Sequence, residues 1–247
     1  MPHDISLWKP SCAAVALCSL LLVAASASAT GLGPNTPQRL SPSLAIDRTE
    51  VTVARYSAYV AATGRVTQAE REGGGFEYVG GWQRRPGWTW RQPEGRPPAS
   101  DQWPAVHLTH AEAQDYCLWA GGRLPTAAEW TLAAYTELRD NPPAPWVRGQ
   151  RYPYPTGDSP EGANTADPDP WPRAAPAGAS RAGVNGLWDM GGNVWEWAAD
   201  AQGPERRTLG GSWWYGPSQM RAEVVAWKPA DFYAVYIGFR CVYDFRP

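Results

Sequence analysis

Residues 109–130, THAEAQDYCLWAGGRLPTAAEW, carry the strongest structural pattern in the chain. They contain two capping boxes, Thr109–Glu112 and Thr126–Glu129, in which a threonine hydroxyl and a glutamate satisfy free backbone amides at a helix start. Apolar residues follow the first box at helical spacing, and Gly121 and Gly122 end that helix. The pattern predicts two helices joined by a tight turn.

A further helix is predicted upstream of this pair. Thr52 is a suitable N-cap, Val53, Tyr56 and Val60 share one face, and Gly64 ends the pattern. Thr and Gly at these two ends are typical start and stop signals, because Thr accepts from free amides and Gly adopts a left-handed conformation at no steric cost.

The other segments favour short strands and long irregular stretches. Residues 43–47, 208–214 and 236–243 read as strands, and 72–104 and 141–181 are rich in Gly and Pro, as expected of a structured loop and of coil. Together these patterns predict an α+β fold that is loop-rich, with short twisted strands and two main helices.

The composition agrees with such a fold. The 247 residues suit one large domain or two small ones, and they include 25 Gly, 25 Pro and 15 Trp, with 19% charged residues. This profile excludes a helical bundle, and the tryptophans can both build a core and line a pocket. The net charge is −2 without a basic stripe, so we expect no nucleic-acid partner.

The N-terminus has the pattern of a secretion signal. Lys9 precedes an apolar run over 13–25, and residues 27–29 read Ala-Ser-Ala, a cleavage site of the A-x-A type. We therefore expect a signal peptide over 1–29, a flexible leader over 30–42, one domain over 43–247, and a periplasmic or secreted protein. The alternative is that the segment is retained as a membrane anchor, although the apolar run is short for a membrane span. After cleavage of the signal we expect no stable membrane span.

Two of the four cysteines lie outside the predicted signal, Cys117 and Cys241. An even pair in an oxidising compartment is a candidate disulfide. Two buried free thiols remain the alternative, because unpaired cysteines are common in cores.

Six runs in chain order resemble motifs of the formylglycine-generating-enzyme (sulfatase-modifying factor) family, and the resemblance covers residues 43–244. The runs are IDRTEVT (46–52), WTWRQPEG (88–95), YCLWAGGRLPTAAEW (116–130), GLWDMGGNVWEW (186–197), LGGSW (209–213) and IGFRC (237–241). The resemblance implies a C-type-lectin-like fold and a disulfide between Cys117 and Cys241. On chain-entropy grounds such a bridge contributes roughly 4 kcal/mol.

The resemblance also implies structural calcium. The first predicted ligand set is Asp189, Glu196 and the carbonyls of Gly192 and Val194, an oxygen set of the kind that calcium prefers. From the residues alone, the alternative is a turn whose acids accept from local amides.

A second calcium site would use Asn164, the carbonyl of Thr165, Asp169 and the carbonyl of Trp171. The chain is shorter between Thr165 and Asp169 than the family pattern, which weighs against this site.

The family's founding enzymes convert a cysteine of their substrate to formylglycine with a copper ion held by two cysteines after a Gly-Gly-Ser motif. Soft thiolates suit copper(I). In this chain the first of those positions falls on Tyr215 and the second within 218–220, and neither is cysteine. We therefore expect no copper and no sulfatase activation.

Five residues form the predicted catalytic groove. The resemblance assigns its walls to Trp195, Ser212 and Arg221, and the sequence adds Tyr215 and Glu223 as groups that could move protons, since an acid beside aromatic walls has a raised pKa. The alternatives are core packing for Trp195 and a satisfied strand-end hydroxyl for Ser212.

Two other branches of the family use different site residues. A branch with a three-histidine iron site does not fit, because only His107 and His110 lie outside the signal. A periplasmic branch that oxidises siderophore precursors lacks the cysteine pair, as this chain does. We therefore predict an oxidative maturation enzyme for a peptide or siderophore-type small molecule. The alternatives are a lectin-like ligand- or protein-binding module without catalysis, and an accessory subunit of an envelope complex.

Overall fold

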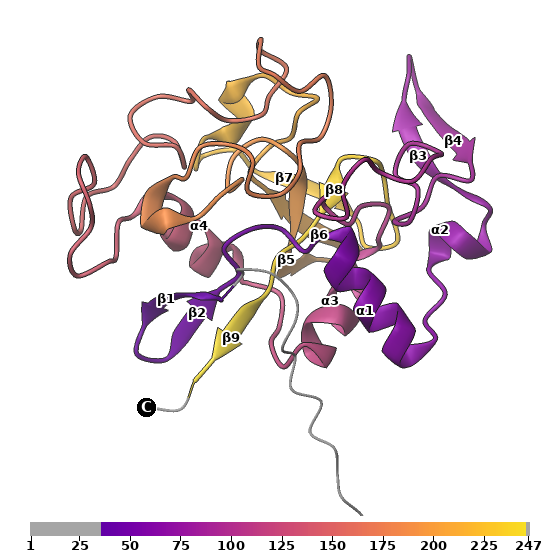
Figure 1. Ribbon diagram of the computed structural model, residues 1–247, viewed down its shortest axis with the longest axis horizontal. Coiled ribbons are helices and arrows are strands. Elements are labelled where there is room, and N and C mark those ends of the chain that lie inside the picture. The colour runs from indigo at the N-terminus through magenta and orange to yellow at the C-terminus, as the bar shows by residue number, and fades with distance from the viewer. Residues whose placement is uncertain (1–35, 246–247) are drawn as a thin grey trace, which may run out of the picture. The chain divides into compact units, whose positions relative to one another are not determined.

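The computed structural model describes residues 36–245, so the predicted signal peptide lies outside the described residues. Three sheets carry the strands (Figure 1). One sheet joins β1 (Gln38–Ser41), β2 (Leu44–Ile46) and β9 (Val242–Asp244). A hairpin pairs β3 (Gly74–Tyr78) with β4 (Trp82–Pro86). The third sheet has the order β7 (Ala226–Pro229), β6 (Glu205–Leu209), β5 (Trp195–Gln202), β8 (Ile237–Gly238), in which only the β5–β8 pair is parallel.

The helices begin where their capping residues predict. Thr52, Thr109 and Thr126 each accept a hydrogen bond from a backbone amide three residues on, and the last two form complete capping boxes. The helices are α1 (Val53–Thr63), α2 (Gln68–Arg71), α3 (His110–Trp119) and α4 (Ala127–Tyr135), with 3₁₀ turns η1 (Val184–Gly186) and η2 (Pro217–Met220). The described chain therefore has three main helices rather than two, since α1 is at least as long as either α3 or α4.

The predicted loop over 72–104 contains the β3–β4 hairpin, which corrects the sequence prediction. Five residue pairs join its strands, from Gly74↔Pro86 to Tyr78↔Trp82. Gly80 and Gly81 form the turn with φ of 63° and 153°, a region that glycine reaches without strain. The alternation was hidden because two glycines and two arginines occupy four of the ten strand positions.

The predicted flexible leader over 30–42 is corrected in its last part. Residues Gln38–Ser41 form β1, which pairs antiparallel with β2, and Leu40 is buried. The ordered domain thus begins before residue 43.

The predicted strands are only partly regular. β2 confirms the strand expected at 43–47. The strand expected at 208–214 stops at Leu209, because Gly210 and Gly211 take φ of 94° and 77°. The one expected at 236–243 is divided into β8 and β9, which belong to different sheets.

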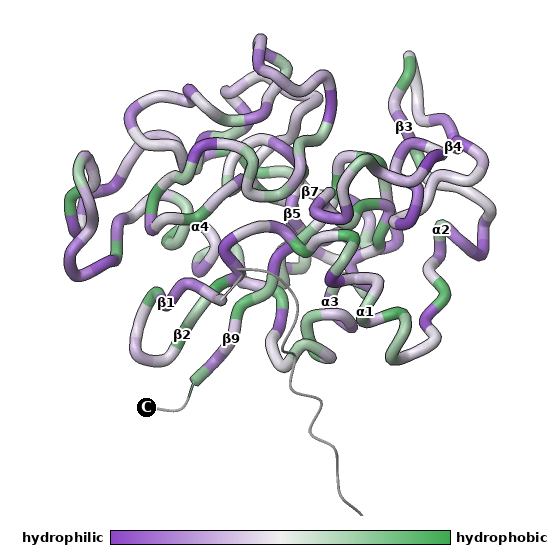
Figure 2. Tube along the Cα trace, in the orientation of Figure 1, coloured by the Kyte–Doolittle hydropathy of each residue, from purple (hydrophilic) through white to green (hydrophobic). Residues whose placement is uncertain are grey.

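The core is built from aromatic rings rather than from long apolar runs. Tyr56 contacts Trp90 and Tyr116, and Tyr116 contacts Phe239, with ring centroids 5.0–5.7 Å apart. Figure 2 agrees with this absence of long apolar runs, since hydropathy changes over short stretches along the trace. Cys117 on α3 and Cys241 are joined by a disulfide with a Cα–Cα distance of 5.5 Å, which is the pairing that the resemblance implies.

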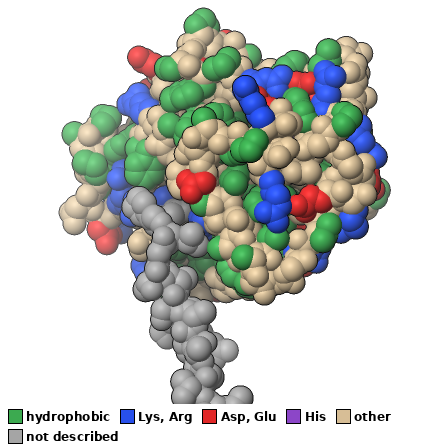
Figure 3. Space-filling model, turned by 45° about the vertical axis from the view of Figure 1, so that its right-hand side comes forward, with side chains coloured by type: hydrophobic (Ala, Val, Ile, Leu, Met, Phe, Trp, Pro, Cys, Tyr) green, Lys and Arg blue, Asp and Glu red, His purple; other side chains and the backbone are tan. Residues whose placement is uncertain are grey.

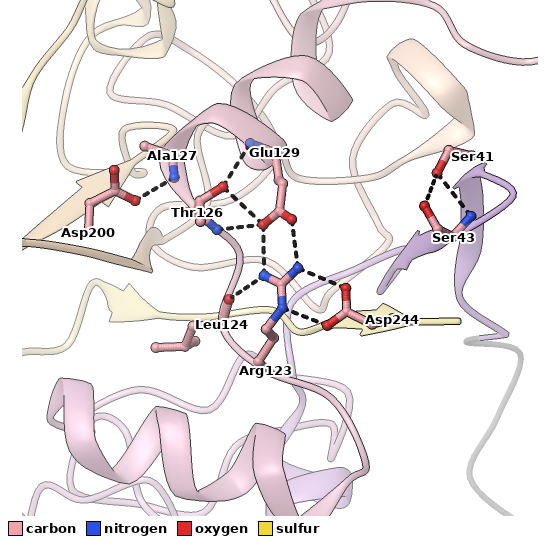
Figure 4. A network of polar contacts seen from close by, with 9 residues as sticks. All are labelled: Ser41, Ser43, Arg123, Leu124, Thr126, Ala127, Glu129, Asp200 and Asp244. Atoms are coloured by element: carbon pink, nitrogen blue, oxygen red, sulfur yellow. Dashed lines mark hydrogen bonds and ion pairs between the residues drawn. The ribbon is translucent and has the colours of Figure 1, made fainter. Parts of the chain in front are cut away.

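Arg123 holds the turn between α3 and α4 to the C-terminal strand (Figure 4). Its guanidinium donates to Glu129 at 2.6 and 2.8 Å and to Asp244 of β9 at 2.7 and 2.9 Å. Thr126 and Glu129 of the capping box therefore also fix the end of β9. Across 36–245, none of the helices has the length and apolarity that a membrane crossing needs.

Candidate functional site

A row of aromatic rings leads from the β3–β4 hairpin to β5. The centroids of Tyr78 and Trp82 lie 5.4 Å apart, Trp82 lies 5.7 Å from Tyr236, Tyr236 lies 6.0 Å from Tyr215, and Tyr215 lies 5.7 Å from Trp195. We call these five residues the aromatic row. Tyr78 and Trp82 are exposed, whereas Trp195 and Tyr236 are buried, so the row connects the surface to the core.

Trp195 combines the two roles that the sequence left open. It is only 2% exposed and belongs to the main hydrophobic cluster. Its indole N–H nevertheless has no hydrogen-bond partner, and its ring carries the ammonium of Lys228 at 5.6 Å from the centroid. The tryptophan is therefore a core residue with one face toward the site.

Ser212 sets the position of Tyr215. Its carbonyl accepts from the Tyr215 amide at 2.9 Å, and its hydroxyl accepts from the Trp214 amide at 3.4 Å. The side chain is fully buried, so its contacts agree with the strand-end alternative. The turn that these two hydrogen bonds form places the ring of Tyr215 against those of Trp195 and Tyr236.

Two of the three phenols of the row, those of Tyr215 and Tyr236, interact directly. Burial raises the pKa of the Tyr236 phenol above its ordinary value, and the nearby Tyr215 hydroxyl, which is hydrogen-bonded to it, raises that pKa further. Tyr236 therefore stays protonated at neutral pH and can donate a hydrogen bond.

Glu223 does not lie beside aromatic walls, which corrects its expected surroundings. Its side chain is 73% exposed and forms an ion pair of 3.5 Å with Arg221. Arg221 is 45% exposed, and its guanidinium lies 5.5 Å from the ring of Tyr154, outside the aromatic row. Both side chains lie at the surface because η2 and the turn after it carry them away from Trp195.

The first predicted calcium set is only partly available as the side chains lie. The two oxygens of Glu196 accept from Arg240 at 2.7 Å each, and one also accepts from the indole N–H of Trp130 at 2.8 Å. Asp189 accepts from the Gly178 amide at 2.6 Å and from the Ser180 hydroxyl. Both acids thus have protein partners, as the alternative of locally satisfied acids expects.

Glu50 is the acid that sequence reasoning missed. It is fully buried, Asn193 donates to one of its oxygens at 2.9 Å, and the other oxygen has no partner. Burial and then the negative charge of Asp189 raise the pKa of Glu50, and burial likewise raises the pKa of Asp189. Glu50 therefore has one carboxylate oxygen without a partner, close to the carboxylate of Asp189.

The second predicted set forms a closed turn. Asp169 accepts from the Thr165 amide at 2.9 Å and from the Trp171 amide at 2.7 Å. Asn164 donates to the Arg173 carbonyl, and its own amide oxygen is buried without a partner. Within residues 36–245 no three or more His, Cys, Asp or Glu side chains converge as metal ligands, so a cation at either place would need amide or backbone oxygens as well.

The two histidines of the described chain are structural. His107 bonds the Pro93 carbonyl at 2.9 Å through Nε2, and burial lowers its pKa to about 4. His110 bonds the Ala198 carbonyl at 3.1 Å.

An arginine-rich depression of about 540 Å³ lies beside the hairpin. Its lining residues are Glu77, Arg85, Trp88, Glu94, Arg96 and Arg173. Glu77 is buried and bound by Arg85 and Arg173, while Arg96 has no ion-pair partner among residues 36–245. Figure 3 shows one face of the molecule, where cations and acids are scattered among hydrophobic side chains without forming a stripe.

Comparison with known proteins agrees with these motifs. Residues 20–245 match the family described as sulfatase-modifying factor enzyme 1-like domain. The formylglycine-generating enzyme of Thermomonospora curvata is 34% identical over 87% of this chain and 86% of its own. The inactive C-alpha-formylglycine-generating enzyme 2 of Mus musculus is 31% identical over 85% of this chain and 78% of its own.

Among solved structures, PvdO from Pseudomonas aeruginosa superposes with a TM-score of 0.60 at 21% identity, covering 82% of this chain and 80% of that one. This likeness supports the fold, an α+β architecture of the C-type-lectin-like class. Motifs, fold and relatives together place the chain in the sulfatase-modifying factor, or formylglycine-generating-enzyme, family.

Proposed function

We propose that this protein is an exported oxidative maturation enzyme, which oxidises an aromatic group of a peptide or siderophore-type small molecule without a copper–cysteine site. The observation that carries the proposal is the place of Tyr215. It stands where the family resemblance puts the first active-site cysteine, and its ring contacts both Trp195 and Tyr236. Both cysteines within residues 36–245 are joined to each other, so no described thiol is free to bind copper.

The residues of the aromatic row suit an aromatic substrate. Exposed Tyr78 and Trp82 can stack on a ring, because offset and edge-to-face aromatic contacts are favourable. The Tyr215–Tyr236 pair can then accept a hydrogen bond from the substrate and pass a proton along. A balanced reaction removes two hydrogen atoms from the substrate and reduces dioxygen to hydrogen peroxide.

The same proposal includes a structural calcium ion and an oxidising compartment. The unpartnered oxygen of Glu50 beside Asp189 supports the cation, and the Cys117–Cys241 bridge supports export to the periplasm or beyond.

The test is oxygen uptake and peroxide release by protein expressed from Thr30 in an oxidising compartment, with a panel of aromatic peptides and phenolic precursors. Tyr215→Phe should reduce turnover at least about a hundredfold, which is the lower end of the range for losing an acid–base group. Tyr154→Phe, which alters a phenol outside the aromatic row, should leave turnover unchanged. Turnover that survives Tyr215→Phe, or stoichiometric copper in the purified protein, would contradict the proposal.

A lectin-like binding module is the second candidate, and the exposed rings of Tyr78 and Trp82 favour it. Calorimetry on the same panel separates the two functions. Binding that Trp82→Ala abolishes, with no oxygen uptake from any ligand, would identify a binding module.

A further inference from the structure

The two faces of the β3–β4 hairpin carry different chemistry. In an antiparallel pair, residues that lie opposite each other share a face, and so does every second residue along a strand. Tyr78, opposite Trp82, therefore belongs to the face that leads into the aromatic row. Glu77 and Arg85 lie on the other face and line the arginine-rich depression. This depression is thus separated from the aromatic row by the hairpin itself.

The buried carboxylate of Glu77 holds two guanidiniums in this depression. Arg85 donates to it through Nε at 2.8 Å, and Arg173 donates to its other oxygen. Burial acts to raise the pKa of Glu77, but the hydrogen bonds from Arg173 and Arg85 lower it overall, so the acid is ionised at neutral pH. Neither Nη group of Arg85 has a partner among residues 36–245. Glu77 therefore orients donors that are left for another acceptor.

Arg96 adds a third guanidinium to the same lining. It is exposed and forms no hydrogen bond or ion pair within the described chain, 36–245. Three arginines and two glutamates leave the lining with a net charge of +1. This charge matches one monovalent anion, whereas Glu94, the second acid of the lining, would repel a group with two negative charges. Among monovalent anions a carboxylate fits best, because the planar fork of arginine binds it through two parallel hydrogen bonds.

An apolar depression of about 300 Å³ adjoins the arginine-rich one, and Glu94 and Arg96 line both. The rest of its lining carries no charge and consists of Pro93, Pro97, Pro98, Ala99 and Trp103. The proline rings fix their own backbone angles, so a ligand that packs on them orders little additional chain. A carboxylate held by the arginines can therefore place an apolar body against the prolines and Trp103.

We propose that the two depressions together bind an organic carboxylate, with its carboxylate group on Arg96 and Arg85 and its apolar or aromatic body against Trp103 and the prolines. A free carboxylic acid presents this chemistry, and so does the C-terminus of a peptide that ends in an apolar residue. The inference goes beyond the proposed oxidation. It concerns binding on the other face of the hairpin and does not depend on turnover, so the two proposals can fail separately.

Ligand-detected NMR titration with 4-phenylbutyrate tests the site. The acid should bind, while 4-phenylbutanamide, which lacks the charge, and acetate, which lacks the apolar body, should each bind at least about tenfold more weakly. Added salt should weaken the binding of the acid, because charges in an open depression are screened. Equal affinities for the acid and the amide, or for the acid and inorganic phosphate, would overturn the proposal.

Single variants locate the site on the protein. Arg96→Gln should weaken the binding of 4-phenylbutyrate about three- to tenfold, because it removes one charged donor. Glu94→Gln should tighten it by a similar factor, because the repelling charge is lost. Trp82→Ala, on the aromatic face, and Arg148→Gln, an exposed arginine outside both linings, should leave it unchanged. Binding that Trp82→Ala abolishes, or that Arg96→Gln leaves intact, would place the ligand elsewhere and refute the assignment.

Competition distinguishes the two sources of the carboxylate. Displacement of 4-phenylbutyrate by N-acetyl-Gly-Gly-Phe with a free C-terminus, but not by the amidated peptide, would assign the site to peptide ends. Failure of both peptides to displace the bound acid would assign it to small carboxylic acids. Equal displacement by the two peptides would contradict the role given to the arginines, because the amidated end carries no charge.

Discussion

Both carboxylate oxygens of Glu196 accept hydrogen bonds from the guanidinium of Arg240, at 2.7 Å each, in the buried centre of the domain. The remaining donors of Arg240 reach the carbonyls of Asp47 and Trp188. This pair joins β5 to the segment after β8 and to the chain before α1. It therefore ties together the motifs at both ends of the sequence.

Arg240→Ala should lower the free energy of unfolding by about 3–5 kcal/mol, because it leaves the buried charge of Glu196 without its partner. Arg221→Ala, which removes an exposed arginine, should change it by less than about 1 kcal/mol. Urea denaturation followed by tryptophan fluorescence measures both. A loss below about 1 kcal/mol for Arg240→Ala would mean that the carboxyl of Glu196 is neutral or otherwise satisfied.

The disulfide should contribute roughly 4 kcal/mol, because it closes a loop of 124 residues in the unfolded chain. The double variant Cys117→Ala, Cys241→Ala should unfold at a lower denaturant concentration by the corresponding amount. The same shift should follow reduction of the wild-type protein, while the double variant should not respond to reductant. A double variant that remains sensitive to reductant would point to another bridge.

The helices could be predicted because their signals are local. Thr52, Thr109 and Thr126 act on amides within three residues, so sequence spacing alone determines the caps. β5 and β7 were missed because their pairing depends on residues far apart in the chain, such as Trp195 with Ile237. Here tertiary packing, rather than periodicity, decides the conformation.

The candidate site could likewise be predicted only where its residues stand in local sequence motifs. Trp195 and Tyr215 were found because they stand in or near recognisable motifs, and the structure brings their rings together. Tyr236 was missed, because only folding brings its ring against that of Tyr215. Glu223 was misplaced since its distance along the chain from Tyr215 says nothing about which way the turn after η2 faces.

Glu50 should make the stability depend on calcium and on pH. Its pKa and that of Asp189 are raised in the folded state, so folding takes up protons and the stability without calcium should fall as the pH rises through those raised values. Calcium should restore the loss by neutralising the two acids. Thermal unfolding between pH 5 and 8, with calcium or with chelator, measures both effects.

Glu50→Gln provides the matched variant for this prediction. It keeps the shape of the side chain and removes its charge, so it should flatten the pH dependence and weaken the stabilisation by calcium. Glu223→Gln removes an exposed charge and should change neither. A calcium effect of equal size in wild type and Glu50→Gln would place the ion elsewhere.

His107 should lower the stability at acid pH, which is the opposite pH dependence to that expected from Glu50 and Asp189. Its pKa is lowered from 6.5 to about 4 by burial, so the unfolded chain binds a proton between these values that the folded chain does not. Stability should therefore fall as the pH drops from about 6.5 towards 4, by an amount on the order of 3 kcal/mol.

His107→Gln tests this limit, since its amide can still donate to the Pro93 carbonyl that Nε2 contacts. The variant should lose part of the acid sensitivity while keeping the fall at higher pH that Glu50 and Asp189 cause. His110→Gln is the comparison, because burial lowers the pKa of His110 as well but that ring is less completely enclosed. If His107→Gln and wild type lose stability in parallel between pH 6.5 and 4, another group controls the acid transition.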